Sequence, residues 1–175
     1  FGGGALKVDF TKDACNRLQQ RFNADVTAIE EDMKGCVWIA TNKGQVWRST
    51  STVLSENTSF VPWTKGIKVN ENYRIYKDRN GCLWLGDEHA GVLYIDPVTE
   101  KVESYKLAPA GRTNFSASIR QFCLDSRNRL WIATAEGLIL FDSKGNTSRL
   151  VQLEDKGVKV KDVRAVAEDK EGNIW

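Results

Sequence analysis

Asp78-Arg-Asn-Gly81-Cys-Leu-Trp84 is one of four copies of a seven-residue motif that repeats along this chain. Each copy begins with Asp, has Gly or Asn three residues later and ends with Trp six residues after the Asp. Successive Trp residues of the motif are 46, 47 and 44 positions apart. The three motif positions, in chain order, are Asp32, Gly35, Trp38, Asp78, Gly81, Trp84, Asp125, Asn128, Trp131, Asp169, Gly172 and Trp175. A period of about 45 residues indicates a repeat architecture.

The residues around each motif are typical of short strands joined by turns. Runs rich in β-branched and aromatic residues precede each Asp, at 26–29, 73–76, 119–122 and 163–166. Asp-x-x-Gly is a turn signal, because Asp can bond its own backbone two residues on and Gly or Asn accepts a positive φ. Two further short runs follow each of the first three Trp residues. Four strands in each period of about 45 residues predict a β-propeller blade.

We therefore predict an all-β fold, a partial β-propeller of four-stranded antiparallel blades that holds roughly four repeat lengths of a larger ring. The expected boundaries are 1–25 for the end of a preceding blade plus an insertion, 26–70, 71–117 and 118–160 for three blades, and 161–175 for the start of the next blade. The beginning and the end of the sequence look like two halves of one motif, so the chain holds nearly four repeat lengths. Four-bladed propellers exist, but larger rings are familiar too, and we expect a larger one. Residues 13–22 alone have a helical alternative, and a decorated loop explains them equally well.

The composition argues against several functional classes. The 175 residues include 25 basic and 23 acidic side chains without blocks of like charge, so nucleic-acid binding is not expected. No apolar run approaches the roughly 18 residues that a membrane helix needs. His89 is the only histidine and no cysteine lies in a CxxC pair. We therefore expect neither a metal site nor a cofactor.

The repeated Trp and Asp residues are predicted to have structural roles. Identical placement in every blade favours packing of the indole rings between blades over stacking on a sugar. Each turn offers one such carboxylate whereas calcium needs about six or more oxygens, so the Asp residues are expected to cap turns. Trp63 is expected on an outer strand. Cys36 and Cys82 are expected to be free and buried, because equivalent positions in neighbouring blades lie about 10 Å apart and a disulfide needs Cα atoms within roughly 7 Å.

The motif and its flanks resemble the two-component regulator propeller repeat: Val-x-x-Ile-x-Glu-Asp precedes it in the first copy, and Trp-Ile-x-Thr and Gly-Leu follow. The resemblance covers the chain outside 11–24 and departs from the pattern mildly at Ala40, Ala133 and Asp87. It implies the periplasmic sensor region of a membrane-bound hybrid histidine kinase, which we expect to be a homodimer. It also implies detection of oligosaccharides from complex polysaccharides. The segment itself is expected to perform no catalysis.

Two other functional classes stay open. One is a propeller enzyme of the lyase or hydrolase type, because streptogramin-lyase-like propellers have a looser version of this repeat. Such a lyase needs a histidine base near a bound metal, and this sequence offers only His89. The other is a pure protein-interaction propeller without a small ligand. Unfinished blade faces are apolar, so missing blades or a second copy of the chain are expected partners, and the isolated segment should associate or be marginally stable.

A candidate ligand face follows from aligning the strands that precede each motif. The position five residues before the Asp holds Thr27, Tyr73, Arg120 and Arg164. These residues are expected near the mouth of the central channel, where loops would add Asp87, Glu88, His89, Arg112, Thr113 and Asn114. Two arginines beside a tyrosine suit the carboxylate or sulfate of an acidic oligosaccharide. The alternative is that Arg120 and Arg164 pair with loop carboxylates such as Asp87 or Glu88, or are simply solvated.

Overall fold

The structure is a computed structural model, and it describes residues 6–9, 14–17, 22–55, 57–68, 73–112 and 114–175. These residues form strands and loops, and no helix of this part of the chain is long and apolar enough to cross a membrane. Three four-stranded antiparallel sheets follow one another, each with its strands in chain order. The predicted all-β fold with propeller blades is confirmed.

The three sheets are named here by their order. The first blade comprises β3 (Val26–Glu31), β4 (Val37–Thr41), β5 (Val46–Ser49) and β6 (Phe60–Trp63). The second comprises β7 (Arg74–Lys77), β8 (Leu83–Gly86), β9 (Gly91–Ile95) and β10 (Val102–Lys106). The third comprises β11 (Ile119–Leu124), β12 (Leu130–Thr134), β13 (Gly137–Asp142) and β14 (Thr147–Val151). Trp63 lies on the outer strand of the first blade, as predicted.

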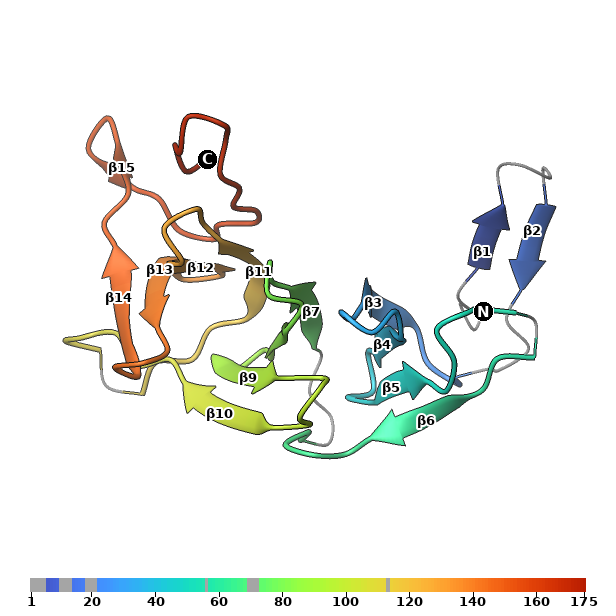
Figure 1. The fold of residues 1–175 in the computed structure, drawn as a ribbon. Coiled ribbons are helices and arrows are strands. Elements are labelled where there is room, and N and C mark those ends of the chain that lie inside the picture. Colours follow the sequence, from blue (N-terminus) through green and yellow to red (C-terminus); the bar gives the residue numbers. More distant parts are fainter. Residues whose placement is uncertain (1–5, 10–13, 18–21, 56, 69–72, 113) are drawn as a thin grey trace.

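The blades lie side by side along an arc (Figure 1), with the first strand of each blade on the inside and the fourth on the outside. The inner strand β7 contacts both β3 and β11, which places the second blade between the other two. Two small hairpins complete the described strands. They pair β1 (Leu6–Asp9) with β2 (Ala14–Arg17) and β15 (Glu154–Asp155) with β16 (Val158–Lys159).

One local prediction is wrong. The helical alternative for residues 13–22 fails because Ala14–Arg17 form strand β2, antiparallel to β1. Four-residue strands have no room for a helical turn pattern, and the pairing of Cys15 with Val8 fixes the register. Residues 10–13 and 18–21 lie outside the described part of the chain.

The hydrophobic core lies between the blades. Trp38 shares a cluster with Leu85 and Leu93 of the second blade, and Trp84 shares one with Ile132 and Phe141 of the third. Trp131 packs with Val166, at the beginning of the next repeat. Each of these rings therefore fills the space toward the following blade, which is the role of a large apolar wedge. Trp175 differs, because 78% of its surface is exposed.

The cysteines are partly as expected. Cys82 is buried and free, whereas Cys36 is free but only half-buried, so the prediction of full burial is wrong for Cys36. The reason is local: Cys36 lies in the turn that precedes β4, where the Arg48 guanidinium reaches its Sγ at 3.7 Å. Burial raises the pKa of the Cys82 thiol and of the half-buried Cys123 thiol, so both stay protonated near neutral pH.

The second and third blades approach each other closely at Gly86. A Cβ added to Gly86 would lie 2.4 Å from Cγ2 of Ile119 and 2.8 Å from Cζ of Phe122. Gly86→Ala is therefore expected to lower the free energy of unfolding by about 1–3 kcal/mol, the usual cost of overpacking a core. Urea denaturation measures the change. A loss below about 0.5 kcal/mol would show that the two blades can separate at no cost.

Candidate functional site

Each Asp of the repeat is bonded in the same way. Its Oδ1 accepts the backbone N–H groups two and four residues on, at 2.8 and 3.0 Å for Asp32 and at 2.9 and 3.0 Å for Asp78. Its Oδ2 accepts the indole Nε1–H of the Trp six residues on, at 2.9 Å in both units. The arrangement recurs at Asp125 and Asp169. We call this arrangement the Asp–Trp unit.

In two of the units the hydrogen bonds lower the pKa of the carboxylate, at Asp125 and Asp169. The indole of Trp175 and the side chain of Asn173 lower the pKa of Asp169 to about 2. At Asp125 burial works to raise the pKa, but the bonds from Trp131 and Arg129 outweigh it and the pKa is lowered. Hydrogen bonds to a charged carboxylate favour its charged form. Asp125 and Asp169 are therefore anionic turn caps that also orient the indole six residues on.

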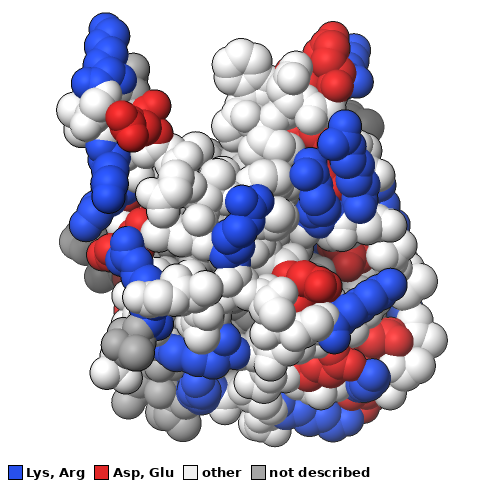
Figure 2. Space-filling view, turned by 90° about the vertical axis from the view of Figure 1, so that its left-hand side faces the viewer, with Lys and Arg blue, Asp and Glu red and all other residues white. Residues whose placement is uncertain are grey.

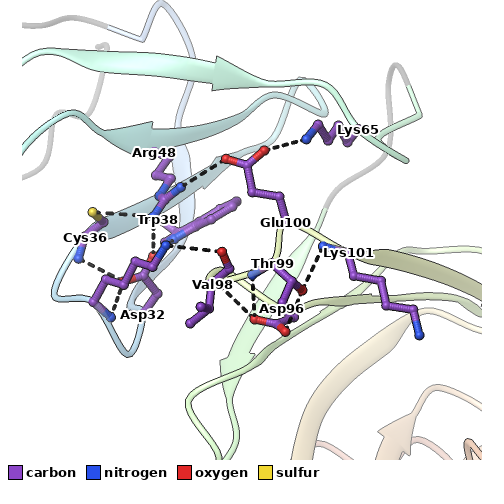
Figure 3. A network of polar contacts seen from close by, with 11 residues as sticks. Asp32, Cys36, Trp38, Arg48, Lys65, Asp96, Val98, Thr99, Glu100 and Lys101 are labelled. Atoms are coloured by element: carbon purple, nitrogen blue, oxygen red, sulfur yellow. Dashed lines mark hydrogen bonds and ion pairs between the residues drawn. The ribbon is translucent and has the colours of Figure 1, made fainter.

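The junction of the first and second blades is closed by a charged network (Figure 3). Arg48 lies over the Trp38 ring, 5.4 Å from its centroid, and its guanidinium approaches Asp32 at 3.2 Å and Glu100 at 4.0 Å. Lys65 approaches Glu100 from the other side at 2.5 Å. These contacts connect strand β5 and the loop after β6 of one blade to the β9–β10 turn of the next. Arg48 thus covers the core indole and bridges two blades.

The second and third blades pack closely at Gly86 and Ile119 but leave a groove at one end of their junction. A groove of about 790 Å³ lies there, at the end of the strands that carries the Asp–Trp turns. Its aromatic lining is Trp84, Tyr94, Tyr105 and Phe141. Trp84 packs on Tyr94 with ring centroids 4.9 Å apart, and Tyr105 packs on Phe141 at 5.2 Å. Burial together with the hydrogen bond to Glu103 raises the pKa of Tyr105 to about 12. The hydroxyl therefore stays protonated and donates a hydrogen bond to that carboxylate.

The polar lining of the groove carries both signs of charge. Four carboxylates face three cations, and one cation, Lys101, pairs with Glu103 at 2.5 Å. The charged residues are Asp78, Asp96, Glu103, Asp142, Lys101, Arg127 and Lys144. The groove combines four aromatic rings with charged and hydrogen-bonding groups, so it can hold a polar group beside an aromatic surface. No group of three or more His, Cys, Asp or Glu side chains in the described ranges is placed to hold a metal ion.

Two residues of the predicted ligand face are buried. Tyr73 is 1% exposed in the core between the first two blades, and its hydroxyl accepts the N–H of Lys68 at 2.9 Å. Asp87 is 2% exposed, and its Oδ1 accepts the N–H groups of His89 at 2.8 Å and Gly91 at 2.5 Å. A ligand-contacting role is therefore wrong for Tyr73 and Asp87. Each side chain is instead used inside the fold, Tyr73 as core and Asp87 as a turn cap.

The predicted arginines do come together, through carboxylates that the sequence reasoning missed. Arg120 and Arg164 share Asp162, at 3.5 and 2.7 Å. Arg112 and Lys161 share Glu136, at 3.6 and 3.9 Å. The two groups adjoin, because Lys161 precedes Asp162 and the Asp162 N–H bonds the carbonyl of Ala135. We call this set the basic rim: Arg112, Arg120, Lys161 and Arg164 with Glu136 and Asp162.

The arginine partners differ from those expected. Arg120 and Arg164 both contact Asp162, which lies two residues before Arg164 in the loop that enters the next repeat. The sequence signal for this pairing is the Asp162-Val-Arg164 spacing, which places an acidic and a basic residue two positions apart. On the side of the molecule that carries β14 and β15, basic and acidic side chains are interspersed (Figure 2).

The other predicted residues are dispersed. His89 is exposed, and its carbonyl accepts the ammonium of Lys106. Asn114 is exposed and adopts φ +58°, a turn conformation. The Thr27 hydroxyl donates to the carbonyl of Tyr73 at 3.2 Å, inside the junction of the first two blades. Thr113 lies outside the described residues. The groove could not be predicted from the sequence, because its lining comes from two repeats.

The profile of the two component regulator propeller family matches three stretches of the chain, 20–43, 66–89 and 115–136. These three stretches are two-component regulator propeller repeats. Each matched stretch contains one Asp–Trp unit, so the features that define the regulator propeller repeat are those that build the turns and the core of these blades. No curated protein sequence matches the chain significantly.

Solved structures with this fold include extracellular domains of regulator systems from B. thetaiotaomicron. The domain of the putative hybrid two component system BT4673 superposes with a TM-score of 0.74 at 16% identity, over 99% of this chain and 23% of that one. The domain of BT3049 gives 0.69 at 21% identity, over 98% and 22%. Virginiamycin B lyase from Staphylococcus aureus gives 0.69 at 14% identity, over 97% and 54%. The chain spans less than a quarter of the two extracellular domains, and the likeness establishes the shared propeller fold.

Proposed function

We propose that this chain is part of the extracytoplasmic sensor region of a hybrid two-component system and that it detects an acidic oligosaccharide. The family of its repeats carries the proposal, since three stretches match the regulator propeller profile. Extracellular domains of two putative hybrid systems share the fold and support it. The segment contributes recognition, and the kinase activity belongs to other parts of the protein.

The basic rim is the proposed contact surface. Arg120 and Arg164 share one carboxylate and their side chains are partly exposed, so N–H donors remain for a ligand. A guanidinium binds a carboxylate or sulfate through two parallel hydrogen bonds. A sulfated or uronic sugar bound at this position would satisfy those donors and compete with Asp162 for the two side chains.

The position of the rim suggests how binding is transmitted. Arg120 belongs to β11 of the third blade, whereas Arg164 belongs to the run that begins the next repeat and packs against Trp131 through Val166. A ligand that holds both arginines would fix the geometry of this junction. Such a ligand shifts a signalling equilibrium only if it binds one junction geometry more tightly than the other. In this proposal a change in the relative position of the two blades carries the signal.

The paired substitution Arg120→Ala with Arg164→Ala tests the proposal. Isothermal titration with a panel of sulfated and uronic oligosaccharides is expected to show binding to the wild-type protein and a loss of at least about tenfold in affinity in the variant, which loses two charge-assisted contacts. The matched control is Arg149→Ala with Lys170→Ala, which removes the same charge from exposed positions outside the rim. Unchanged affinity in the rim variant, with an unaltered circular-dichroism spectrum, would remove this surface from consideration.

A further inference from the structure

Three of the four Asp–Trp units carry a second side-chain donor on the carboxylate. In addition to the indole N–H, Oδ2 of Asp32 lies 3.2 Å from an amino group of Arg48. Oδ2 of Asp125 accepts Nε–H of Arg129 at 2.6 Å. Oδ2 of Asp169 accepts the amide of Asn173 at 3.0 Å. An indole N–H together with a second N–H donor is therefore the usual environment of this oxygen.

In two of these units the second donor is a guanidinium that also covers the indole. Arg48 lies 5.4 Å from the centroid of the Trp38 ring, and Arg129 lies 5.2 Å from that of the Trp131 ring. A cation over an aromatic face gains from the negative face of the ring, and more so where water is excluded. A buried Asp carboxylate beside it supplies the opposite charge. The Asp–Trp unit is thus a guanidinium site that the chain fills with its own arginine in the first and third blades.

In the second blade Tyr94, and not an arginine, packs on the indole, with ring centroids 4.9 Å apart. In the sheet register Arg48 pairs with Trp38, and the residue that pairs with Trp84 is Tyr94. Four residues after Asp78, where the third blade has Arg129, the second blade has Cys82. The Tyr94 hydroxyl donates a hydrogen bond to the Sγ of Cys82 at 3.0 Å. Among the described residues the Oδ2 of Asp78 accepts a bond only from Trp84.

The groove opens at this site. Asp78, Trp84 and Tyr94 all line the space of about 790 Å³ between the second and third blades. The carboxylate that reaches across the first junction is also missing in the second. The β9–β10 turn places Glu100 beside Arg48, whereas the matching turn of the third blade has Asn146, with a similar positive φ. The junction of the second and third blades therefore has Tyr94 and Asn146 where the junction of the first and second blades has the Arg48–Glu100 ion pair.

The charge of the groove suits one added cation. Its lining holds four carboxylates and three cations, so a bound monocation balances the charge. The aromatic walls accept the flat face of a guanidinium, and the volume far exceeds what that group needs, which leaves room for the molecule that carries it. A compact ammonium would match the charge but not the planar stacking seen at Arg48 and Arg129.

We propose that this groove binds the guanidinium group of an arginine-containing ligand, which supplies beside Asp78 the positive charge that Arg48 and Arg129 supply in the neighbouring blades. Because Tyr94 already packs on Trp84, the guanidinium would stack on Tyr94 and donate to the Oδ2 of Asp78. The groove lies at the opposite end of the third blade's strands from Glu136 of the basic rim, because the β11–β12 turn carries Asp125 and the β12–β13 turn carries Glu136. The site is therefore separate from the proposed oligosaccharide surface and does not depend on it.

Titration with N-acetyl-arginine amide, followed by calorimetry or by NMR of the indole N–H signals, tests the proposal. Saturable binding is expected, with a shift of the Trp84 indole resonance. The neutral isostere N-acetyl-citrulline amide is expected to bind at least tenfold more weakly, since it lacks the charge. Free arginine and the tripeptide Gly-Arg-Gly form two further arms, and tighter binding of the tripeptide would indicate a peptide as the natural source of the group.

Variants that supply an internal arginine sharpen the test. Tyr94→Arg places a guanidinium at the register position of Arg48 and is expected to reduce affinity for N-acetyl-arginine amide at least tenfold. Cys82→Arg repeats the test at the position of Arg129, should Tyr94→Arg fail to fold. The control Leu140→Arg adds the same charge at the matching position of the third blade, where Arg129 already occupies the unit, and is expected to change affinity less than twofold. Absent saturable binding, equal binding of the citrulline compound, or undiminished binding to a folded Tyr94→Arg or Cys82→Arg variant would each overturn the proposal.

Discussion

Trp38→Ala is expected to lower the free energy of unfolding by about 3–5 kcal/mol, the usual cost of truncating a buried tryptophan to alanine. The Trp38 side chain is fully buried between the first and second blades, and its indole donates to Asp32 at 2.9 Å. Truncation also removes the surface on which Arg48 lies. Urea denaturation followed by far-UV circular dichroism measures the loss.

The same substitution at Trp175 is the matched control. Trp175 occupies the same motif position and donates to Asp169 at 2.6 Å, but 78% of its surface is exposed. Its replacement by alanine in the 175-residue chain is expected to cost less than about 1 kcal/mol, the contribution of an exposed hydrogen bond and little burial. Equal losses at the two positions would contradict the view that burial between blades is what the repeated tryptophan contributes.

Asp125→Ala is expected to lower the free energy of unfolding by about 3–5 kcal/mol, because it leaves buried donors and a positive charge without their acceptor. Asp125 is fully buried, and it accepts the backbone N–H groups of Arg127 and Arg129, the Arg129 guanidinium and the Trp131 indole. Asp125→Asn keeps the shape and one acceptor oxygen and should cost less.

The contribution of Asp125 also depends on pH. Its pKa is lower in the folded protein than the ordinary value of about 3.9, so the stabilisation is fully present above that value and is lost as the pH falls through the folded pKa. The difference in unfolding free energy between wild type and Asp125→Asn should therefore shrink between neutral pH and about pH 3. A pH-independent difference would show that the charge of this carboxylate does not matter.

The blades could be predicted from the sequence because the decisive interactions are local. Asp78 caps its own turn through residues two and four positions away, and its indole partner is six positions away. Such short spacings are visible as a motif, and the period of the motif gave the number of strands in each repeat. The residues 13–22 were less clear, since a four-residue strand there has neither the turn motif nor a clear alternation.

The sites were harder to predict because they are made across repeats. Position five before the Asp holds Tyr73 in one blade and Arg120 in another, yet the first is core and the second is partly exposed. The difference arises from the 64–68 loop, where the N–H of Lys68 meets the Tyr73 hydroxyl. Likewise the groove exists because Tyr94 stands where the preceding blade has Arg48, a difference that has meaning only once the sheet register is known.

Hydrogen–deuterium exchange of the protein with and without the acidic oligosaccharides tests the central claim most directly. The sensor proposal predicts ligand-dependent protection at the basic rim, in residues 118–121 and 160–164, and unchanged exchange in those peptides for the variant that combines Arg120→Ala with Arg164→Ala. Protection confined to the groove between the second and third blades, or no protection with any member of the panel, would contradict it.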